Sequence, residues 1–300
     1  MQDLPNKREP SLMPWLMVWF CYMAFYEITK LFNVTNFISG WLMFFGGFAT
    51  SMLIGGYSAW FILRTSSKIR LTFILLLISS LFLLTNGSIY HYLYNVLHFT
   101  RAQVSITLFS TYNLLYLGYL ITQVAVWISI LATLPPQERR STFFCVPATV
   151  IVLAAFLIYI FAVQWNITSF SLIGFYDGLD EILQLFSFVA AALCLITSQN
   201  RGLTYLALGY LIVRIAGFVM GFRFFAQAYG SGSIAEAGWL LGDVITIYGL
   251  YLIKKTSVFL QNTPWVAIPS TTRSQIAFWS FISSIGAFAL LSIVAFVFKL

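Results

Sequence analysis

The feature that most constrains this chain is a series of long apolar stretches that fill nearly all of its 300 residues. Each stretch is long enough to cross a bilayer, because a helix of about 20 residues spans the hydrocarbon core. Hydrophobic residues make up 60% of the chain and charged residues only 8%, unlike a soluble domain. Apolar runs without strand-like alternation satisfy their backbone groups in lipid as helices. The sequence therefore predicts an all-α polytopic transmembrane bundle, with residues 1–300 forming one integral membrane domain.

Charged residues and Pro- or Gly-containing breaks divide the chain into about nine predicted spans. Their ranges are 12–32, 38–63, 71–97, 104–134, 143–165, 172–197, 202–229, 235–258 and 275–299. With a cytoplasmic N-terminus, eleven Lys and Arg residues fall on the cytoplasmic side, three on the outer side and two within spans. This positive-inside bias predicts a cell-membrane protein, of an inner or plasma membrane, with its N-terminus in the cytoplasm.

The net charge of +7 follows from this topology and from contact with anionic lipid headgroups. Basic residues never cluster beyond two or three, so we expect no nucleic-acid partner. Nine spans also place the C-terminus outside. That position would not suit a sensor module that continues into a cytoplasmic output domain.

Three short sequence matches favour an internal duplication. Similar segments begin at Asn33 and Asn166, 133 residues apart, and two further pairs are 132 residues apart. Those pairs are Leu71-Thr72 with Leu203-Thr204, and Tyr116–Ile121 with Tyr248–Ile253. Repeats over 12–134 and 143–258 would each contain four spans. An even number of spans repeats in the same orientation, so an axis along the membrane normal would relate the halves, with 275–299 as an extra helix.

Ionisable side chains inside the predicted spans give the candidate site, because charge at membrane depth costs several kcal/mol unless it is paired or hydrated. Asp177, Asp180 and Glu181 follow i, i+3, i+4 spacing, which places them on one helical face. The predicted ligand-binding set is Glu27, His91, Asp177, Asp180, Glu181, Arg214, Arg223 and Asp243. One interpretation is a buried ion-pair network that joins three helices. The other is a polar cavity open to the outer side, in which Arg223 recognises an anion or the aspartates bind a cation or proton.

Two functions from different classes follow. The preferred one is a membrane protein that binds, and in the fuller interpretation translocates, a small ligand or ion. The alternative is a sensor or an assembly subunit of a larger membrane complex, without transport activity. The ionisable residues of the second half stop at Arg214, well short of the cytoplasmic loop, and this absence of a continuous path favours the alternative. The chain carries no nucleotide-binding or hydrolase motif that identifies a cofactor or an enzyme.

A minor enzymatic alternative comes from Tyr176-Asp177 and Gly242-Asp243, which lie in separate predicted spans. The pair resembles the Tyr-Asp and Gly-x-Gly-Asp motifs of presenilin-like intramembrane aspartyl proteases, and the resemblance implies two catalytic aspartates. The chain departs from that pattern at Leu240, where the motif has Gly, and no Pro-Ala-Leu segment follows. Arg223 would also hold both carboxyl groups ionised, whereas the mechanism needs a shared proton.

Overall fold

The computed structural model of the chain describes residues 11–31, 36–65, 68–93, 111–133, 149–150, 172–198, 200–225 and 234–255. Within these ranges the protein is all-helical. The seven helices are α1 (Met13–Leu31), α2 (Asn36–Arg64), α3 (Lys68–His91), α5 (Thr111–Leu131), α7 (Leu172–Thr197), α8 (Arg201–Phe225) and α9 (Ile234–Lys255).

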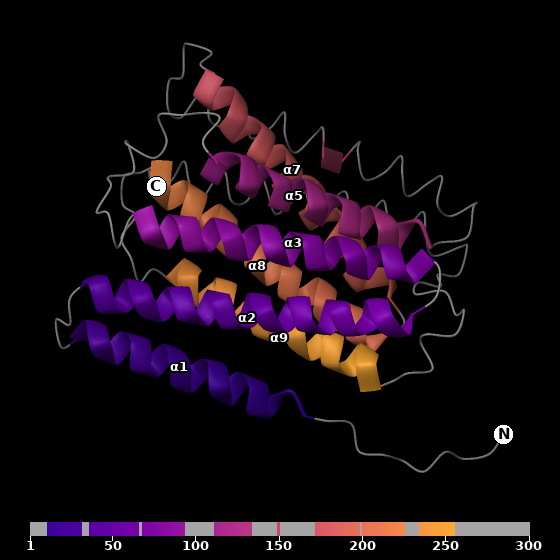
Figure 1. Ribbon diagram of the computed structural model, residues 1–300, viewed down its shortest axis with the longest axis horizontal. Helices are drawn as coiled ribbons and strands as arrows, with labels where there is room; N and C mark the ends of the chain where they lie inside the picture. Colours follow the sequence, from indigo (N-terminus) through magenta and orange to yellow (C-terminus); the bar gives the residue numbers. More distant parts are fainter. Residues whose placement is uncertain are drawn as a thin grey trace.

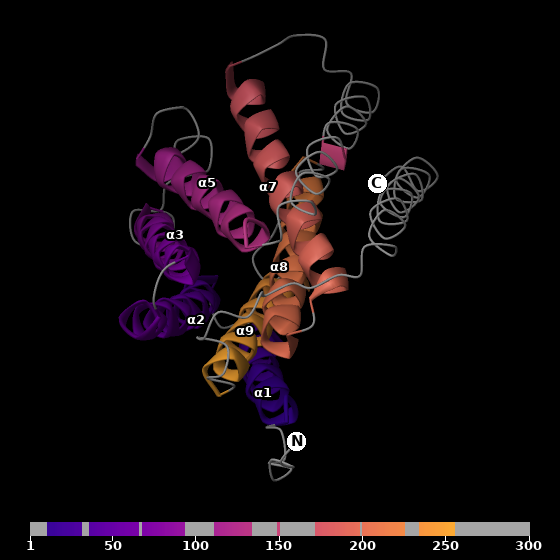
Figure 2. The same cartoon turned by 90° about the vertical axis from the view of Figure 1, so that its right-hand side faces the viewer.

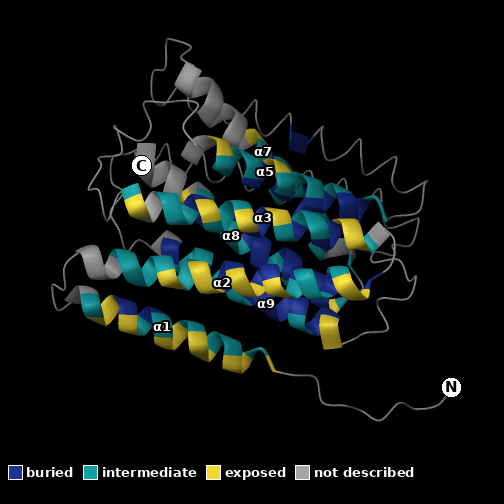
Figure 3. Cartoon of the chain, viewed as in Figure 1, coloured by how far each residue is buried: buried dark blue, intermediate teal, exposed yellow. Residues whose placement is uncertain are grey.

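Four of these helices are long and apolar enough to cross a membrane, which supports a membrane-embedded protein. The qualifying segments are Gly40–Arg64, Ile69–Ile89, Leu114–Leu131 and Glu236–Lys255. Large apolar side chains also remain exposed on the surface, among them Leu63 at 82% and Val18 at 70%. Figure 3 shows the buried residues concentrated toward the centre, especially along α8 and α9. An apolar exterior around this interior is what lipid as a solvent requires.

Seven of the nine predicted spans coincide with described helices. The prediction for α7, 172–197, matches both of its ends, and that for α1, 12–32, is within one residue at each end. The predicted span 71–97 runs past the end of α3 at His91. The spans predicted at 143–165 and 275–299 lie outside the described residues, apart from 149–150. The count of nine therefore stays a prediction.

The helices pack along a shared direction in two groups (Figures 1 and 2). One group contains α2, α3 and α5, in which α3 packs against both neighbours. The other contains α7, α8 and α9, in which α8 packs against both neighbours. The groups meet where α2 packs on α9 and where α5 packs on α7, and α1 lies against α2 and α9.

The closest contact in the bundle is between α8 and α9, and four glycines make it. They recur at seven-residue spacing, as Gly202 and Gly209 on α8 and Gly242 and Gly249 on α9. A Cβ atom at Gly249 would lie 2.6 Å from the backbone nitrogen of Leu206 and 2.7 Å from the carbonyl oxygen of Gly202. The two backbones therefore touch directly, which is how small residues promote association of helices in membranes.

Candidate polar site between the helix groups

Arg214 on α8 is the most deeply placed charge in the described part of the chain, with 3% of its surface exposed. Its Nη2 donates a 2.8 Å hydrogen bond to the Tyr119 hydroxyl, and its Nη1 donates a 3.4 Å bond to Oε1 of Gln184. Its guanidinium carbon also lies 4.8 Å from the ring centroid of Tyr210. Arginine accepts such a setting because its planar, weakly hydrated cation combines directional donors with stacking on aromatic faces. Arg214 therefore joins α5, α7 and α8.

Asp243 on α9 is the second charged residue of the site. The Thr50 hydroxyl of α2 donates a 2.7 Å hydrogen bond to its Oδ2 atom. This bond crosses from one helix group to the other. Arg214 also attracts the Asp243 carboxylate electrostatically. Among the described residues, the site thus contains one cation and one anion, each of them anchored by neutral side chains.

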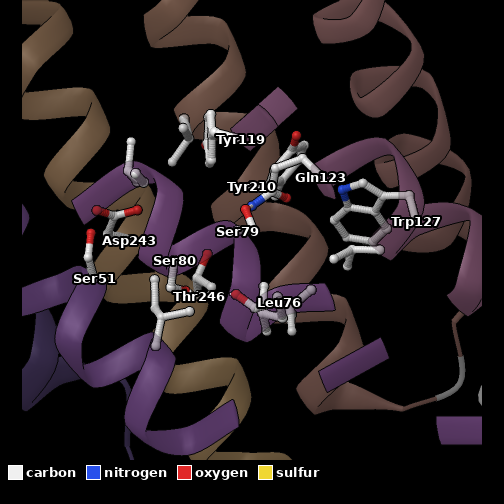
Figure 4. A pocket seen from close by; sticks show the side chains of 15 residues that line it. Ser51, Leu76, Ser79, Ser80, Tyr119, Gln123, Trp127, Tyr210, Asp243 and Thr246 are labelled. Atoms are coloured by element: carbon white, nitrogen blue, oxygen red, sulfur yellow. Dashed lines mark hydrogen bonds between the residues drawn. The ribbon is translucent and has the colours of Figure 1, made fainter. Parts of the chain in front are cut away.

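A cavity of about 40 Å³ lies beside these residues. Its lining comes from both helix groups: α2, α3 and α5 on one side, and α8 and α9 on the other. The lining residues are Ser51, Ile54, Leu76, Ser79, Ser80, Leu83, Tyr119, Gln123, Val126, Trp127, Leu206, Tyr210, Val213, Asp243 and Thr246. Figure 4 shows Asp243 and Ser51 at one end of the cavity lining and Trp127 at the other.

The polar lining continues as paired side chains between α3 and α5. The Gln123 amide donates a 2.6 Å hydrogen bond to the Ser79 hydroxyl. Further along the same two helices, the Thr72 and Ser129 hydroxyls lie 2.8 Å apart and share a hydrogen bond. All four side chains are buried. Neutral polar groups therefore extend past the cavity toward the end of the bundle where α3 begins and α5 ends.

Trp127 supplies a donor that the described protein atoms leave unused. Its side chain is 1% exposed, and its indole N–H has no hydrogen-bond partner among the described residues. In Figure 4 the indole nitrogen lies on the ring edge that faces Gln123 and Tyr210. A buried donor without an acceptor costs about 1–3 kcal/mol, so an acceptor inside the cavity is expected.

The structure brings together only part of the predicted site. Arg214 and Asp243 are central to it. Glu27 is exposed on α1 and does not line the cavity. The remaining predicted residues have helical backbones, but their side chains lie outside the described set. These are His91 at the end of α3, Asp177, Asp180 and Glu181 in α7, and Arg223 in α8. Their membership of the site stays a prediction.

The neutral members of the site are absent from the sequence prediction. A search for ionisable residues selects Arg214 and Asp243 but passes over Thr50, Tyr119 and Gln184, which hold them. It also passes over the serines and Gln123 of the first half, because such residues are common in membrane helices. One usable signal was present: Ser79 and Ser80 interrupt the otherwise apolar run 73–84 of α3, and both are buried.

Comparisons with known proteins add no assignment, because no protein-family model, curated protein or solved structure matches this chain.

Proposed function

We propose that this chain is a multi-pass membrane protein that binds, and translocates, a small ligand or ion through the cavity between its two helix groups. The observation that carries the proposal is the cavity itself. Hydroxyls, an amide and one carboxylate line it, and so does Trp127, whose indole N–H has no partner among the described residues. Buried polar groups with no protein partner usually mark a bound molecule or water. Ionisable residues at membrane depth mark ligand and ion pathways.

The position of the cavity supports transport over simple binding. It lies where the helix groups meet, and membrane carriers place their sites at the interface of structural repeats. The predicted duplication pairs α2 with α7, α3 with α8 and α5 with α9. An axis that exchanges the halves would turn the α2–α9 contact into the α7–α5 contact, and both contacts occur. This reciprocity supports the duplication as part of the proposal.

The main argument against a carrier was that ionisable residues do not form a continuous path to the cytoplasmic side. The hydrogen-bonded polar pairs between α3 and α5 supply polar groups in that direction. Ser79 and Gln123 belong to the lining, and beyond the cavity the buried Thr72–Ser129 pair continues the series of polar groups along the helices. In the proposed topology this direction leads to the cytoplasmic side, because α3 would begin there and α5 would end there. The path therefore depends on neutral groups.

A second candidate function is a sensor or assembly subunit without transport. The hydrogen bonds of Arg214 favour it, because they join α8 to α7 through Gln184 and to α5 through Tyr119. Glu236 acts similarly, accepting a 3.0 Å hydrogen bond from the Tyr26 hydroxyl of α1. In that case the polar cluster would fix the helix arrangement, and a signal molecule or a partner subunit would act on it.

A screen of small ions and polar solutes for thermal stabilisation of the purified protein tests the binding proposal. A ligand that binds only the folded state at 100 times its dissociation constant stabilises by about 2.7 kcal/mol. We expect at least one such ligand, and the double variant Ser79→Ala/Gln123→Leu should abolish its effect. The matched control is Thr72→Val/Ser129→Ala, which removes the other buried pair between α3 and α5 without altering the lining. Equal loss in both double variants would contradict the assignment of the cavity as the site.

The orientation in the membrane is tested by cysteine accessibility in intact cells. A cysteine at position 139 should react only after the membrane is permeabilised, because Arg139 belongs to a predicted cytoplasmic loop. A cysteine added at the C-terminus should react with an impermeant reagent from outside. Protection at both positions would rule out the nine-span topology.

A further inference from the structure

The part of the cavity around Asp243 is rich in oxygen atoms. Ser51, Ser80 and Thr246 line it together with the carboxylate (Figure 4). The Ser80 hydroxyl donates its proton to the Leu76 carbonyl at 2.9 Å, which leaves its lone pairs available as acceptors. Carboxylate and hydroxyl oxygens are the ligands that hard cations prefer.

The charge of the lining favours a cation over an anion. Asp243 is the single acidic residue among the described lining residues, and no Lys, Arg or His is among them. Arg214 lies behind the lining residues Tyr119 and Tyr210, with its guanidinium carbon 5.3 Å and 4.8 Å from their ring centroids. It tempers the negative charge of Asp243 and is not itself among the lining residues. Among the described residues, the titratable groups near Asp243 are Arg214 and Tyr210 of α8 and Tyr119 of α5, while α2 contributes the neutral Thr50.

The number of acidic residues in the lining also indicates the charge of the cation. Divalent ions in proteins are usually held by several acidic oxygens, and the described residues contain no group of three or more His, Cys, Asp or Glu side chains that could hold a metal ion. Asp243 is the one carboxylate among the described lining residues, and Arg214 already offsets part of its charge, so the site compensates no more than one added positive charge. A monovalent cation therefore fits this end of the cavity.

The size of the cavity limits the cargo further. A volume of about 40 Å³ accommodates roughly three water-sized particles, because a water needs about 10–15 Å³ on this measure. A cation at Asp243 with one or two accompanying waters fills that space. A water at the far end can accept the hydrogen bond that the Trp127 N–H offers.

We infer that the cavity binds a monovalent cation, Na⁺ or a hydrated proton, with Asp243 as its acidic ligand and the hydroxyls of Ser51 and Ser80 as further oxygen ligands. This inference rests on the proposed function, since it names the cargo of the same cavity. Na⁺ and the hydrated proton share the need for oxygen acceptors and one negative charge. Experiment separates them.

The first arm measures binding of radioactive ²²Na⁺ to the purified full-length protein at neutral and at acidic pH. Asp243→Asn should weaken binding at least about tenfold, which corresponds to 1.4 kcal/mol, while its amide oxygen can still accept the bond from Thr50. Glu236→Gln is the matched control. It removes the other acid of α9, which bonds Tyr26 and lies outside the cavity lining. Binding that is lost in Asp243→Asn and retained in Glu236→Gln assigns Na⁺ to the site.

The second arm uses proteoliposomes that contain a pH-sensitive dye. If the proton is the cargo, an imposed membrane potential should drive proton uptake by the wild-type protein and by Glu236→Gln, but not by Asp243→Asn. Proton uptake without ²²Na⁺ binding assigns the proton as the cargo. Unfolding temperatures of the three proteins, measured in parallel, show whether each variant is folded.

Two results would overturn the inference. If neither ²²Na⁺ nor protons depend on Asp243, while another solute from the stabilisation screen depends on Ser79 and Gln123, the monovalent-cation assignment is wrong and the proposed binding function stands. If no ion or solute shows any dependence on the cavity residues, both are wrong.

Discussion

Replacing Gly242 by alanine is expected to lower the free energy of unfolding by about 1–3 kcal/mol, the usual cost of inserting a methyl group into a filled interior. The added Cβ atom would lie 2.6 Å from Cγ2 of Val213 and 2.9 Å from its backbone nitrogen. A backbone atom cannot move aside as a flexible side chain can. The loss should appear although alanine favours the helix by about 1 kcal/mol. Gly242→Leu should prevent folding altogether.

Gly56 on α2 provides the control for this prediction. A Cβ atom there would meet nothing within 4 Å, so Gly56→Ala should be neutral or stabilising by up to about 1 kcal/mol. Unfolding by a denaturing detergent measures both variants under one condition. Equal stability of Gly242→Ala and Gly56→Ala would show that α8 and α9 are not in backbone contact.

Replacing Arg214 by methionine is expected to destabilise the protein by about 3–5 kcal/mol, as removal of one partner from a buried charged network typically does. The Tyr119 hydroxyl would lose its 2.8 Å bond to the guanidinium. Asp243 would lose the nearby positive charge that attracts it. Arg214→Lys should recover little, because an ammonium group lacks the fork of donors that reaches both Tyr119 and Gln184.

Two further variants identify the cause of that loss. Arg214→Met/Asp243→Asn should be more stable than Arg214→Met alone, since it removes the carboxylate left without a counter-charge. Lys254→Met removes another cation that lies over aromatic rings, 4.9 Å from that of Trp60. Lys254 is exposed, and exposed cation–π pairs are worth about 0.5–1 kcal/mol, so this loss should be small. A loss in Arg214→Met no larger than that in Lys254→Met would contradict a central role for Arg214.

The sequence predicted the fold class and most helix positions because both depend on local properties, namely the hydropathy and the length of each apolar run. The match at 172–197 illustrates this, since both ends of α7 follow from the ends of an apolar run. The α8–α9 contact was not predicted, although the seven-residue spacing of Gly202 and Gly209 is visible in the sequence. A spacing shows that two glycines share a face, but it does not show which helix they meet.

The site was predicted in part for a similar reason. The cost of burying charge identified Arg214 and Asp243 as residues that need partners. It also led to the expectation of acidic partners for Arg214, whereas its described hydrogen-bond partners are the neutral Tyr119 and Gln184. Tyr119 lies 95 residues from Arg214 in the chain, so their meeting depends on how the helices pack. Local sequence patterns do not contain that information.

The direct backbone contact between α8 and α9 has a consequence for motion. If one helix slid past the other, backbone atoms that are in contact at the glycines would collide. Backbone atoms cannot move aside as side chains do by changing rotamer, so the pair should move as one rigid body. In the proposed carrier, access to the cavity from alternate sides of the membrane would then depend on the two contacts between the helix groups, α2 with α9 and α5 with α7. The Thr50–Asp243 hydrogen bond joins the helices of the first contact. A cation that competes with Thr50 for the Asp243 carboxylate would weaken this hydrogen bond. Occupancy of the cavity would thereby be coupled to rocking of one helix group against the other.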